Sequence, residues 1–460
     1  MNVGVDVGPT NTDAAVLDET GAVRATVKVA SVPGDPVAGV VAALGALAAA
    51  PAPVAPPGTF AALATPGTAA TSIDRISIGL RGAARAVAER DRLCRVAVLR
   101  IGGPAAQAVR PLYGWPADLL ETVRAGTAIV DGGGGLSPED WIPLDRDAVA
   151  RFAARVAGRA EAVAITGVFA PVDGAQEREA AEIVRAELGP LPVSLSADLG
   201  TLGLIERENT TVLDAALSRF ARDTAERLAA ALAGAAVFVT RGDGTLMSLE
   251  YLARHPGLSL GSGPASALRG AGVLAGLDDA VVADVGAARV RVGALAGGFP
   301  EEATRGADVG GVPVGFRFPE LIRVARDADP GELAEAVDRL QPGADRLPLV
   351  VVGGGAPDVP DAFFGVPDVR RPEHGRAAGA IGAATSPVGG QSERIVRLDD
   401  RTRLPAELEA VAEEARANAV RAGADPRHTR AVEAGSSPLP YLPGSFIKLR
   451  ARAAGPPSRL

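Results

Sequence analysis

Hydrophobic and polar positions are arranged most clearly at the start of the chain. An apolar run over residues 2–7 includes Asp6 and is followed by Gly8, and a second apolar run, Ala14 to Leu17, comes after a polar turn. Three polar side chains lie in that turn: Thr10, Asn11 and Thr12. Two apolar runs joined by a turn rich in glycine and hydroxyl groups predict a β-hairpin.

The residue types of this hairpin favour binding of an anion such as a phosphate group. A glycine at position 8 lets the backbone approach an anion closely, and successive turn N–H groups can point inward together. Thr10, Asn11 and Thr12 add further donors. Asp6 is placed where a carboxylate can hold Mg²⁺ through water. The alternative is a plain hairpin turn, and Pro9 removes one N–H group from the turn.

The same pattern occurs a second time, in residues 281–295. Asp284 and Gly286 match Asp6 and Gly8. We therefore expect two related lobes that face each other across a nucleotide cleft, an arrangement similar to actin, sugar kinases and Hsp70. The two hairpins are predicted to superpose, with both turns facing the cleft.

The second hairpin lacks the phosphate donors of the first. Residues 288–291 read Ala-Arg-Val-Arg, without a hydroxyl group or a second acid. Arg289 and Arg291 share one face of the predicted strand, which favours either an anion site or a solvated, ion-paired face. We expect phosphate binding mainly at the first hairpin.

The rest of the chain alternates between predicted strands and helices, which is typical of layered α/β proteins. The predicted strands cover residues 95–101, 162–168, 191–195, 237–240, 347–352, 394–398 and 446–450, and the predicted helices cover 35–49, 173–188, 209–233, 379–384 and 405–422. A proline-rich stretch, 50–58, predicts an exposed loop. Gly353, Gly354 and Gly355 close a buried strand and are predicted to border an adenosine.

Composition narrows the class of protein. A chain of 460 residues is long enough for two or three domains. A net charge of −8 gives no electrostatic case for nucleic-acid binding. The single cysteine, Cys94, excludes an internal disulfide and sits in or beside an apolar strand. The apolar stretches are too short to span a membrane, and the first residues predict a strand rather than a signal peptide. We expect a cytoplasmic protein.

Histidines and carboxylates offer few further candidates. His255, His374 and His428 have no ligand spacing, so we expect no His-ligated transition metal and assign them to surface or capping positions. Any bound ion should be oxygen-ligated and near Asp6. Four carboxylates are candidates for acid–base work, although exposed positions are the usual case for such residues: Asp198, Glu206, Glu208 and Asp243.

Several segments, taken in order, resemble the hydantoinase/oxoprolinase family, in the short single-chain form similar to hydantoin utilization protein A. They are DVGPTNTDAAVLD at the N-terminus, 203–217, 240–248, 262–270, 283–286, 371–375 and 438–444. Each motif alone is weak, but the ordered set is specific and covers nearly the whole chain.

The resemblance implies a two-lobed fold of the acetate-kinase/Hsp70/actin type (ribonuclease H-like), with lobes at 1–170 and 171–386 and a small α+β extension at 387–460. Active members open cyclic amides such as hydantoins or 5-oxoproline with ATP and Mg²⁺. Phosphorylation of the amide oxygen makes the carbonyl carbon open to attack by water. The implied partners are a small-molecule ligand and a second hydantoinase-type subunit or a second copy of the chain.

The chain departs from the family pattern in three further places. Where a Thr-Thr-His-x-Thr-Asn stretch is expected, residues 80–85 read Leu-Arg-Gly-Ala-Ala-Arg; Gly132–Gly135 replaces a Gly-Gly-His-Glu motif, and Ser196–Asp198 replaces Ser-His-Glu. Together with the altered second hairpin, these changes predict a degenerate active site.

Two hypotheses follow. In the first, the chain is an ATP-dependent cyclic-amide hydrolase in which Asp6 and Asp284 act at the reaction centre, Gly8 and Gly286 lie in the two turns, and nucleotide binding persists better than hydrolysis. Arg85, Arg289 and Arg291 are then the candidates for replacement charges. In the second, the chain is a non-catalytic member that binds a ligand or partners an active subunit. A small-molecule kinase is a third, weaker alternative.

Overall fold

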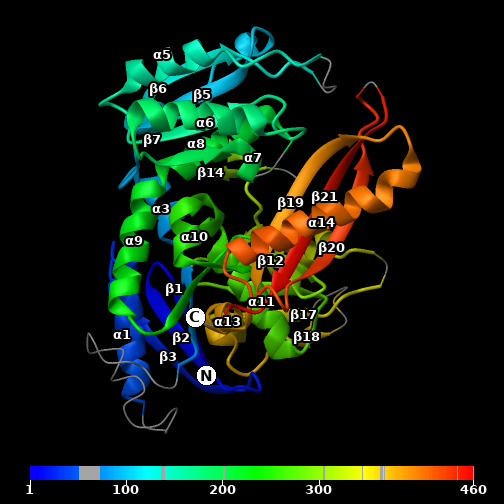
Figure 1. Cartoon of the computed structure of the whole chain (residues 1–460). Helices are drawn as coiled ribbons and strands as arrows, with labels where there is room; N and C mark the ends of the chain where they lie inside the picture. The colour runs from blue at the N-terminus through cyan, green and yellow to red at the C-terminus, as the bar shows by residue number, and fades with distance from the viewer. Residues whose placement is uncertain are drawn as a thin grey trace.

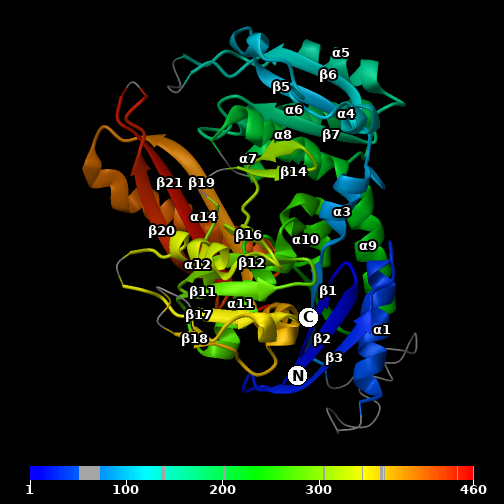
Figure 2. The ribbon, with the colours of Figure 1, turned by 180° about the vertical axis from the view of Figure 1, so that it is seen from behind.

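The computed structural model describes residues 1–50, 73–135, 140–199, 202–303, 306–343, 345–362, 366, 368–442 and 444–458. Within these ranges the chain forms a mixed α/β fold built on several sheets (Figures 1 and 2). The proline-rich stretch predicted as an exposed loop, apart from Ala50, lies outside the described residues. No helix in the described ranges is long and apolar enough to cross a bilayer.

The largest sheet has nine strands in the order β20-β21-β19-β10-β9-β4-β1-β2-β3. They are β1 (Asn2–Val7), β2 (Asn11–Leu17), β3 (Val23–Ala30), β4 (Arg75–Leu80), β9 (Ala236–Thr240), β10 (Leu246–Ser248), β19 (Val388–Arg397), β20 (Arg430–Pro438) and β21 (Phe446–Gly455). This one sheet therefore draws on all three segments that the sequence predicts as separate units, 1–170, 171–386 and 387–460.

The predicted first hairpin is confirmed as β1 and β2, and it is buried on both faces. Val3, Val5 and Val7 belong to the core cluster that includes α1 (Pro36–Ala48). On the opposite face, Ala15 and Leu17 pack with α13 (Ala378–Thr385). Burial on both faces explains why this hairpin is continuously apolar rather than alternating.

A second sheet contains the second predicted hairpin. Its order is β13-β12-β11-β17-β18, and β16 also pairs with β12. The strands are β11 (Ala280–Val285), β12 (Arg289–Ala296), β13 (Phe299–Pro300), β16 (Ile322–Ala325), β17 (Leu349–Val352) and β18 (Val369–Arg370). In both sheets the first strand of the hairpin pairs antiparallel with the second and parallel with a later strand, β4 or β17. The two hairpins therefore sit in equivalent local topologies.

A third, parallel sheet of four strands lies at the top of Figure 1. Its order is β6 (Arg124–Asp131), β5 (Val96–Gly103), β7 (Ala162–Gly167) and β8 (Val193–Leu195). The helices α5 (Arg146–Val156) and α6 (Ala175–Leu188) share a hydrophobic cluster with it, and α8 (Leu204–Ala216) packs on β7. Alternating strands and helices produce this layer, as the sequence predicts.

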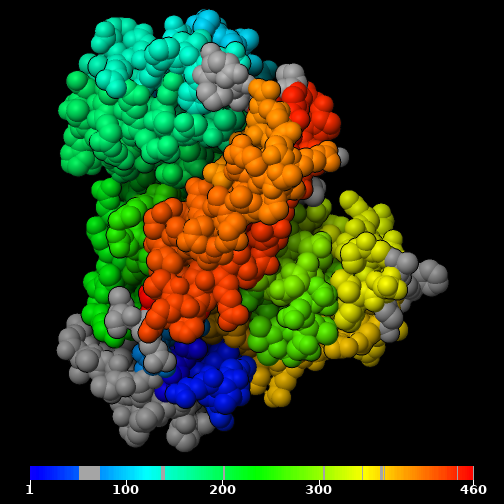
Figure 3. Space-filling view, turned by 45° about the vertical axis from the view of Figure 1, so that its right-hand side comes forward, coloured from blue at the N-terminus to red at the C-terminus, as the bar shows by residue number. Residues whose placement is uncertain are grey.

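Further helices and a two-stranded ribbon complete the fold. They are α3 (Gly82–Glu89), α4 (Ala117–Val123), α7 (Ser196–Leu199), α10 (Leu249–Arg254), α11 (Ser262–Ala275), α12 (Pro330–Arg339), α14 (Leu404–Arg421), and the ribbon of β14 (Ala307–Val309) and β15 (Val312–Val314). The helix α14 packs along β19, β20 and β21. In Figure 3 these C-terminal residues, orange and red, extend over the face between the cyan-green upper part and the yellow-green lower part.

The single long helix predicted for residues 209–233 is wrong. The structure has two helices, α8 and α9 (Ser218–Ala231), which are separated at Leu217. The carbonyl of Ala216 accepts a hydrogen bond from the backbone N–H of Cys94, at 2.8 Å. A contact from a distant loop thus takes up a carbonyl that a continuous helix would use itself.

Two glycine-rich helices join the sheets that carry the hairpins. The helix α13 packs on β1, β2 and β4, whereas α11 packs on β11, β12 and β17, and the two helices contact each other extensively. A Cβ atom at Gly270 would lie 1.9 Å from the Ala378 carbonyl oxygen, and one at Gly382 would lie 1.9 Å from that of Ser266. Only glycine allows the two backbones to approach so closely, which confirms the close packing predicted for residues 379–384.

Candidate functional site

The two hairpins bring their acidic residues to one arginine. Asp6 lies near the end of β1 and Asp284 near the end of β11. Arg81, which follows β4, donates from Nη2 to Asp6 Oδ2 at 3.1 Å. The carboxylate of Asp6, together with those of Asp284 and Asp13, raises the pKa of Arg81. We call Asp6, Arg81, Asp284 and Arg291 the hairpin junction.

Each acidic residue of the hairpins has its own cationic partner. Arg291 Nη1 donates to Asp284 Oδ2 at 2.8 Å. Lys28 Nζ lies 3.2 Å from Asp13 Oδ1. With Arg81 on Asp6, the charges of the hairpin junction are balanced by side chains of the chain itself.

Asp6 keeps one oxygen without a partner. Its Oδ1 atom is buried and makes no hydrogen bond with any described residue, and the same is true of Thr240 Oγ1. A Cβ at Gly79 would lie 2.9 Å from the first atom and 3.6 Å from the second, so both face the same small space. Hard cations such as Mg²⁺ need about six oxygen ligands, and the guanidinium already holds the other oxygen of Asp6. While Arg81 stays in place, these residues do not fit a Mg²⁺ ion on Asp6.

The donors predicted at the first turn divide into two groups. The Gly8 N–H closes the turn by donating to the Asn11 carbonyl at 2.9 Å. Thr12 is buried, and its hydroxyl lies 2.9 Å from the hydroxyl of Ser31. Thr10 and Asn11 are exposed at the tip. Of the three polar side chains predicted as donors in this turn, Thr10 and Asn11 are therefore open to a ligand and Thr12 is not.

The second turn lies against the glycine run that follows β17. Gly286 closes its turn by donating to the Arg289 carbonyl at 3.0 Å. Gly353 has a φ of 93°, and a Cβ there would lie 2.8 Å from Asp284 Oδ1. Gly355 donates to the Val285 carbonyl at 3.0 Å, whereas Gly354 faces open space. The structure thus brings residues 284–286 and 353–355 together.

Sequence reasoning missed Arg81, although it singled out the segment that contains it. In the parallel pairing of β1 and β4, Val7 pairs with Leu80, so Arg81 follows at the same end of the sheet and its side chain reaches Asp6. Of the arginines named in advance, Arg291 lies in the hairpin junction, whereas Arg85 pairs with Glu89 on the outside of α3. No local sequence pattern indicates that β4 pairs with β1, because the two strands are far apart along the chain.

A cavity of about 690 Å³ lies between β8, α10, β19 and α14. We call it the polar cavity. Its wall includes Asp198, Arg241, Tyr251, His255, Asn418 and Arg421. Of the segments that depart from the family motifs, only Ser196–Asp198 reaches it, through Ala197 and Asp198, whereas Gly132–Gly135 does not line it. A concave site with convergent polar groups is the usual form of a small-molecule site.

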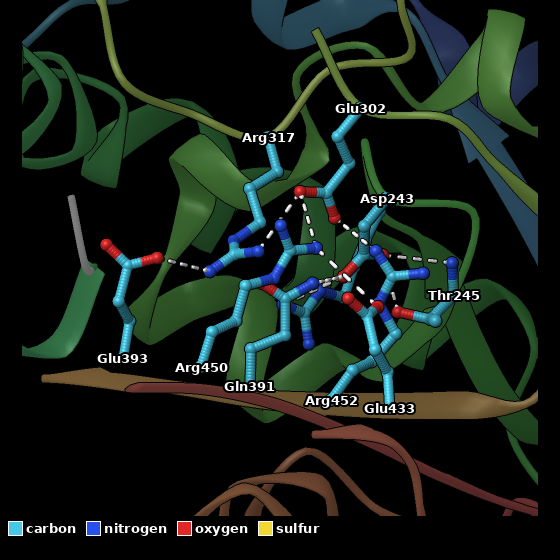
Figure 4. Close-up of polar contacts among 10 residues, drawn as sticks. Asp243, Thr245, Glu302, Arg317, Gln391, Glu393, Glu433, Arg450 and Arg452 are labelled. Atoms are coloured by element: carbon cyan, nitrogen blue, oxygen red, sulfur yellow. Dashed lines mark hydrogen bonds and ion pairs between the residues drawn. The ribbon is translucent and has the colours of Figure 1, made fainter. Parts of the chain in front are cut away.

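A network of partly buried ion pairs reaches one wall of the polar cavity through Arg317 and Glu393 (Figure 4). Glu302 accepts from Arg317 at 3.0 Å, from Arg450 at 3.0 Å and from Arg452. Arg317 also lies 3.2 Å from Glu393. Burial alone would raise the pKa of Glu302, but the three guanidinium groups lower it. The network holds the C-terminal sheet against the rest of the chain with charged groups.

Asp243 is part of this wall and is buried, contrary to the expectation of an exposed carboxylate. Thr245 donates to it through both the backbone N–H and the hydroxyl group, and Gln391 donates at 2.7 Å. Arg241 lies 3.3 Å away and lowers its pKa against the effect of burial. Glu208, also expected to be exposed, is buried against Arg100.

Asp214 lies beneath the polar cavity and is fully buried. Its oxygens accept from the Ser194 hydroxyl at 2.7 Å and from the Gly257 N–H at 2.8 Å, and both of these residues line the cavity. Burial raises the pKa of Asp214 to about 7. Near neutral pH the folded protein therefore holds a proton that the unfolded chain releases.

We expect the Asp214→Asn variant to gain stability relative to the parent as the pH rises. Between about pH 4, where unfolded aspartate titrates, and pH 7, the folded parent binds more protons than the unfolded parent, so its stability falls with pH. The variant lacks this dependence; its amide oxygen still accepts from the Gly257 N–H, and its amide nitrogen donates to the Ser194 hydroxyl in place of the second hydrogen bond. Denaturant unfolding between pH 5 and 8.5, with the exposed Asp223→Asn as control, measures the difference. A difference that does not change with pH contradicts the assignment.

The histidines occupy separate places. His255 stacks on Tyr251, with ring centroids 4.6 Å apart, and burial together with Arg241, Arg254 and Arg421 lowers its pKa to about 4. It is the C-cap residue of α10, in agreement with the predicted capping position, and it also lines the polar cavity. His374 and His428 lie beside Glu373 and Asp425. Among the described residues, no group of three or more His, Cys, Asp or Glu side chains is arranged to hold a metal ion.

Known structures resemble this fold along its whole length. A nucleotide-free structure of acetone carboxylase, from work on ATP-dependent acetone carboxylation, has a TM-score of 0.65 and 15% identity, covering 100% of this chain and 88% of that one. An ATP-dependent caprolactamase from Pseudomonas jessenii has a TM-score of 0.70 and 17% identity, with the same coverage. At these identities the likeness shows the fold alone. No match to the chain was found among curated proteins.

Sequence comparison with protein families is more specific. The family model described as the hydantoinase/oxoprolinase N-terminal region matches residues 2–188. The model described as hydantoinase/oxoprolinase matches residues 207–329. The two matches follow each other in order and contain both hairpins, and they confirm the family that the motifs indicate. The chain belongs to the hydantoinase/oxoprolinase family.

Proposed function

We propose that the chain is a nucleotide-binding member of its family, related to the ATP-dependent hydrolases of cyclic amides, with a hairpin junction that supports little hydrolysis. The proposal includes a two-lobed fold of the acetate-kinase/Hsp70/actin type, with lobes at 1–170 and 171–386 and an extension at 387–460. The observation that carries it is the ion pair of Arg81 with Asp6, on whose guanidinium group the charge of Asp284 also acts.

A guanidinium in this position supplies what a phosphate ligand needs. Arginine carries a permanent charge and a planar set of donors that suits phosphate oxygens. Arg81 uses one Nη atom on Asp6, and its Nε has no hydrogen-bond partner in the described part of the chain. Thr10 and Asn11 add exposed donors from the hairpin tip. These groups would hold the phosphates, with the glycine run 353–355 beside the nucleoside.

The same arrangement disfavours hydrolysis. Phosphoryl transfer depends on metal ions and positioned donors that neutralise charge in the transition state. Asp6 and Asp284 are both engaged by arginines, and the second turn has no hydroxyl group. Loss of one such donor costs roughly 10²–10³ in rate. We expect ATP turnover near background with hydantoin or 5-oxoproline present.

Calorimetry with ATP or ADP tests the proposal. We expect similar affinities with Mg²⁺ and with EDTA, because Arg81 already balances the carboxylates. The Arg81→Gln variant should bind at least tenfold more weakly, since a hydrogen bond to a charged group contributes about 1.5–3 kcal/mol. Arg85→Gln, on the outside of α3, is the matched control. Binding that requires Mg²⁺, or robust substrate-stimulated turnover, would contradict the proposal.

A non-catalytic partner role is the second candidate, and one surface favours it. The edge strand β20 is exposed along most of its length, and Val432 and Tyr441 are exposed on and beside it. Unpaired strand edges are templates for pairing with another chain. Light scattering of the purified chain, alone and mixed with a second hydantoinase-type subunit, should then show a dimer or a complex that Val432→Lys weakens. A monomer in both samples would exclude this role.

A further inference from the structure

The two oxygen atoms of the Asp6 carboxylate have different surroundings. Oδ2 accepts from Arg81 Nη2 at 3.1 Å, and Arg81 is the only ion-pair partner of Asp6 among the described residues. Oδ1 is buried and makes no hydrogen bond with any of them. The side chain of Asp6 is 11% exposed, so its charge depends on the guanidinium group for compensation, since a buried charge without a partner is costly.

Oxygen atoms from two strands surround the space beside Asp6 Oδ1. A Cβ atom on Gly79 would lie 2.9 Å from Asp6 Oδ1 and 3.6 Å from Thr240 Oγ1. The Val5 carbonyl oxygen is 3.6 Å from the same point. The hydroxyl group of Thr240, the last residue of β9, is also buried without a partner in the described part of the chain. Because residue 79 is glycine, these oxygens face one small space.

The backbone of α13 restricts the same carboxylate. A Cβ atom on Gly379 would lie 2.5 Å from Asp6 Oδ2 and 2.9 Å from Asp6 Cγ. The carboxylate is therefore packed against two glycine backbones, one in β4 and one in α13, and it has little room to turn. Its charge has to be balanced where it lies.

The guanidinium group of Arg81 is held in place by packing as well as by charge. A Cβ atom on Gly263, in the first turn of α11, would lie 2.6 Å from Arg81 Nε and 2.8 Å from Arg81 Cζ. The Ser262 hydroxyl donates to the Leu80 carbonyl at 3.1 Å, which ties the same turn to the end of β4. The guanidinium is thus a fixed part of the hairpin junction rather than a mobile surface group.

We propose that the guanidinium group of Arg81 is a built-in counter-ion that takes the place of a divalent cation at Asp6, and that the oxygens facing Gly79 bind a hard cation once this group is removed. Carboxylate, hydroxyl and carbonyl oxygens are ligands that Mg²⁺ and Mn²⁺ prefer, with water completing the shell. In the parent chain the guanidinium occupies one carboxylate oxygen and repels a second cation. The inference shares the hairpin junction with the proposed function, but it does not depend on a bound nucleotide.

Titration of the nucleotide-free full chain with Mn²⁺, followed by the loss of the EPR signal of the free ion, tests the proposal. We expect Arg81→Ala to bind Mn²⁺ at least about tenfold more tightly than the parent chain, and Mg²⁺ to displace it. Arg81→Lys keeps the positive charge and should not gain the site. Arg227→Ala is the matched control, because it removes a guanidinium from Asp35, whose side chain is 33% exposed.

Two further variants identify the ligands. The double variant Arg81→Ala, Asp6→Asn should lose the gained affinity, and Arg81→Ala, Thr240→Val should lose part of it. In the parent chain Thr240→Val should not lower the thermal stability, because the hydroxyl group that it removes has no partner among the described residues. A purely structural role of residue 240 would give the reverse pattern.

Thermal unfolding shows whether Arg81→Ala is folded, and Arg81→Gln, which keeps part of the side-chain stem, replaces it if it is not. Equal affinity for Mn²⁺ in the parent and in the folded variant would overturn the proposal. So would a gain of affinity that survives Asp6→Asn. Because no nucleotide is present, failure here is distinguishable from failure of nucleotide binding, which the calorimetry with ATP or ADP measures.

Discussion

Replacing Glu208 with alanine is expected to lower the free energy of unfolding by about 3–5 kcal/mol. Glu208 accepts from Arg100 Nε and Nη2, both at 2.7 Å, and neither side chain is more than 1% exposed. Removal of the carboxylate leaves a buried guanidinium without a counter-charge, which is more costly than the pair itself is stabilising. Urea or guanidinium unfolding followed by circular dichroism measures the change.

The exposed pair of Glu250 and Arg254 provides the control. Their side chains are 77% and 62% exposed, so Glu250→Ala should change the stability by no more than about 1 kcal/mol. The double variant Arg100→Met, Glu208→Leu should recover much of the loss, because it removes both charges together. Equal losses of stability in Glu208→Ala and Glu250→Ala would show that the buried ion pair of Arg100 and Glu208 does not form in solution.

The second large effect is expected at the contact between α11 and α13. Gly270→Ala and Gly382→Ala each place a Cβ atom within 2 Å of a backbone carbonyl oxygen of the other helix. The backbone cannot rotate away as a side chain can, so the helices must separate. Overpacking of this kind costs about 1–3 kcal/mol or more. Thermal and denaturant unfolding of each variant measure the loss.

Gly45→Ala is the matched control, because Gly45 lies inside α1 and a Cβ there meets nothing within 4 Å. That variant should be neutral or more stable by up to about 1 kcal/mol, since alanine favours the helix. The glycine variants should also weaken nucleotide binding, because α13 carries Gly379 against Asp6, whereas α11 packs on the strand that carries Asp284. Full stability of Gly270→Ala would disprove the close backbone contact.

Local sequence patterns predicted most elements but not their partners. The hairpins at 2–17 and 280–296 were predicted because in each of them two short apolar runs flank a turn with the Asp-x-Gly pattern. The break at Leu217 was missed because a distant N–H group causes it. The pairing of β10 with β19 was also not predictable, since only the folded chain brings residues 246 and 388 together.

In the candidate sites, too, the residues marked by a local sequence pattern were predicted and those that depend on distant contacts were not. The repeated Asp-x-Gly pattern predicted that Asp6 and Asp284 would belong together, and both act on Arg81. The contact of Arg81 with Asp6 could not be predicted, because it depends on the parallel pairing of β4 with β1. The polar cavity had no local signal, because segments near residues 198, 241, 255, 317 and 421 contribute to its wall.

The nine-stranded sheet has a consequence for the order in which the protein folds during synthesis. The strands β1, β2, β3, β4, β9 and β10 all lie within residues 2–248. On the side away from β9, β10 pairs with β19, which is synthesised about 140 residues later. Until then the nascent chain carries an open strand edge, and long-range pairing of this kind is slow to form. Ribosome-bound chains ending near residue 386 should therefore bind chaperones more strongly than full-length chains.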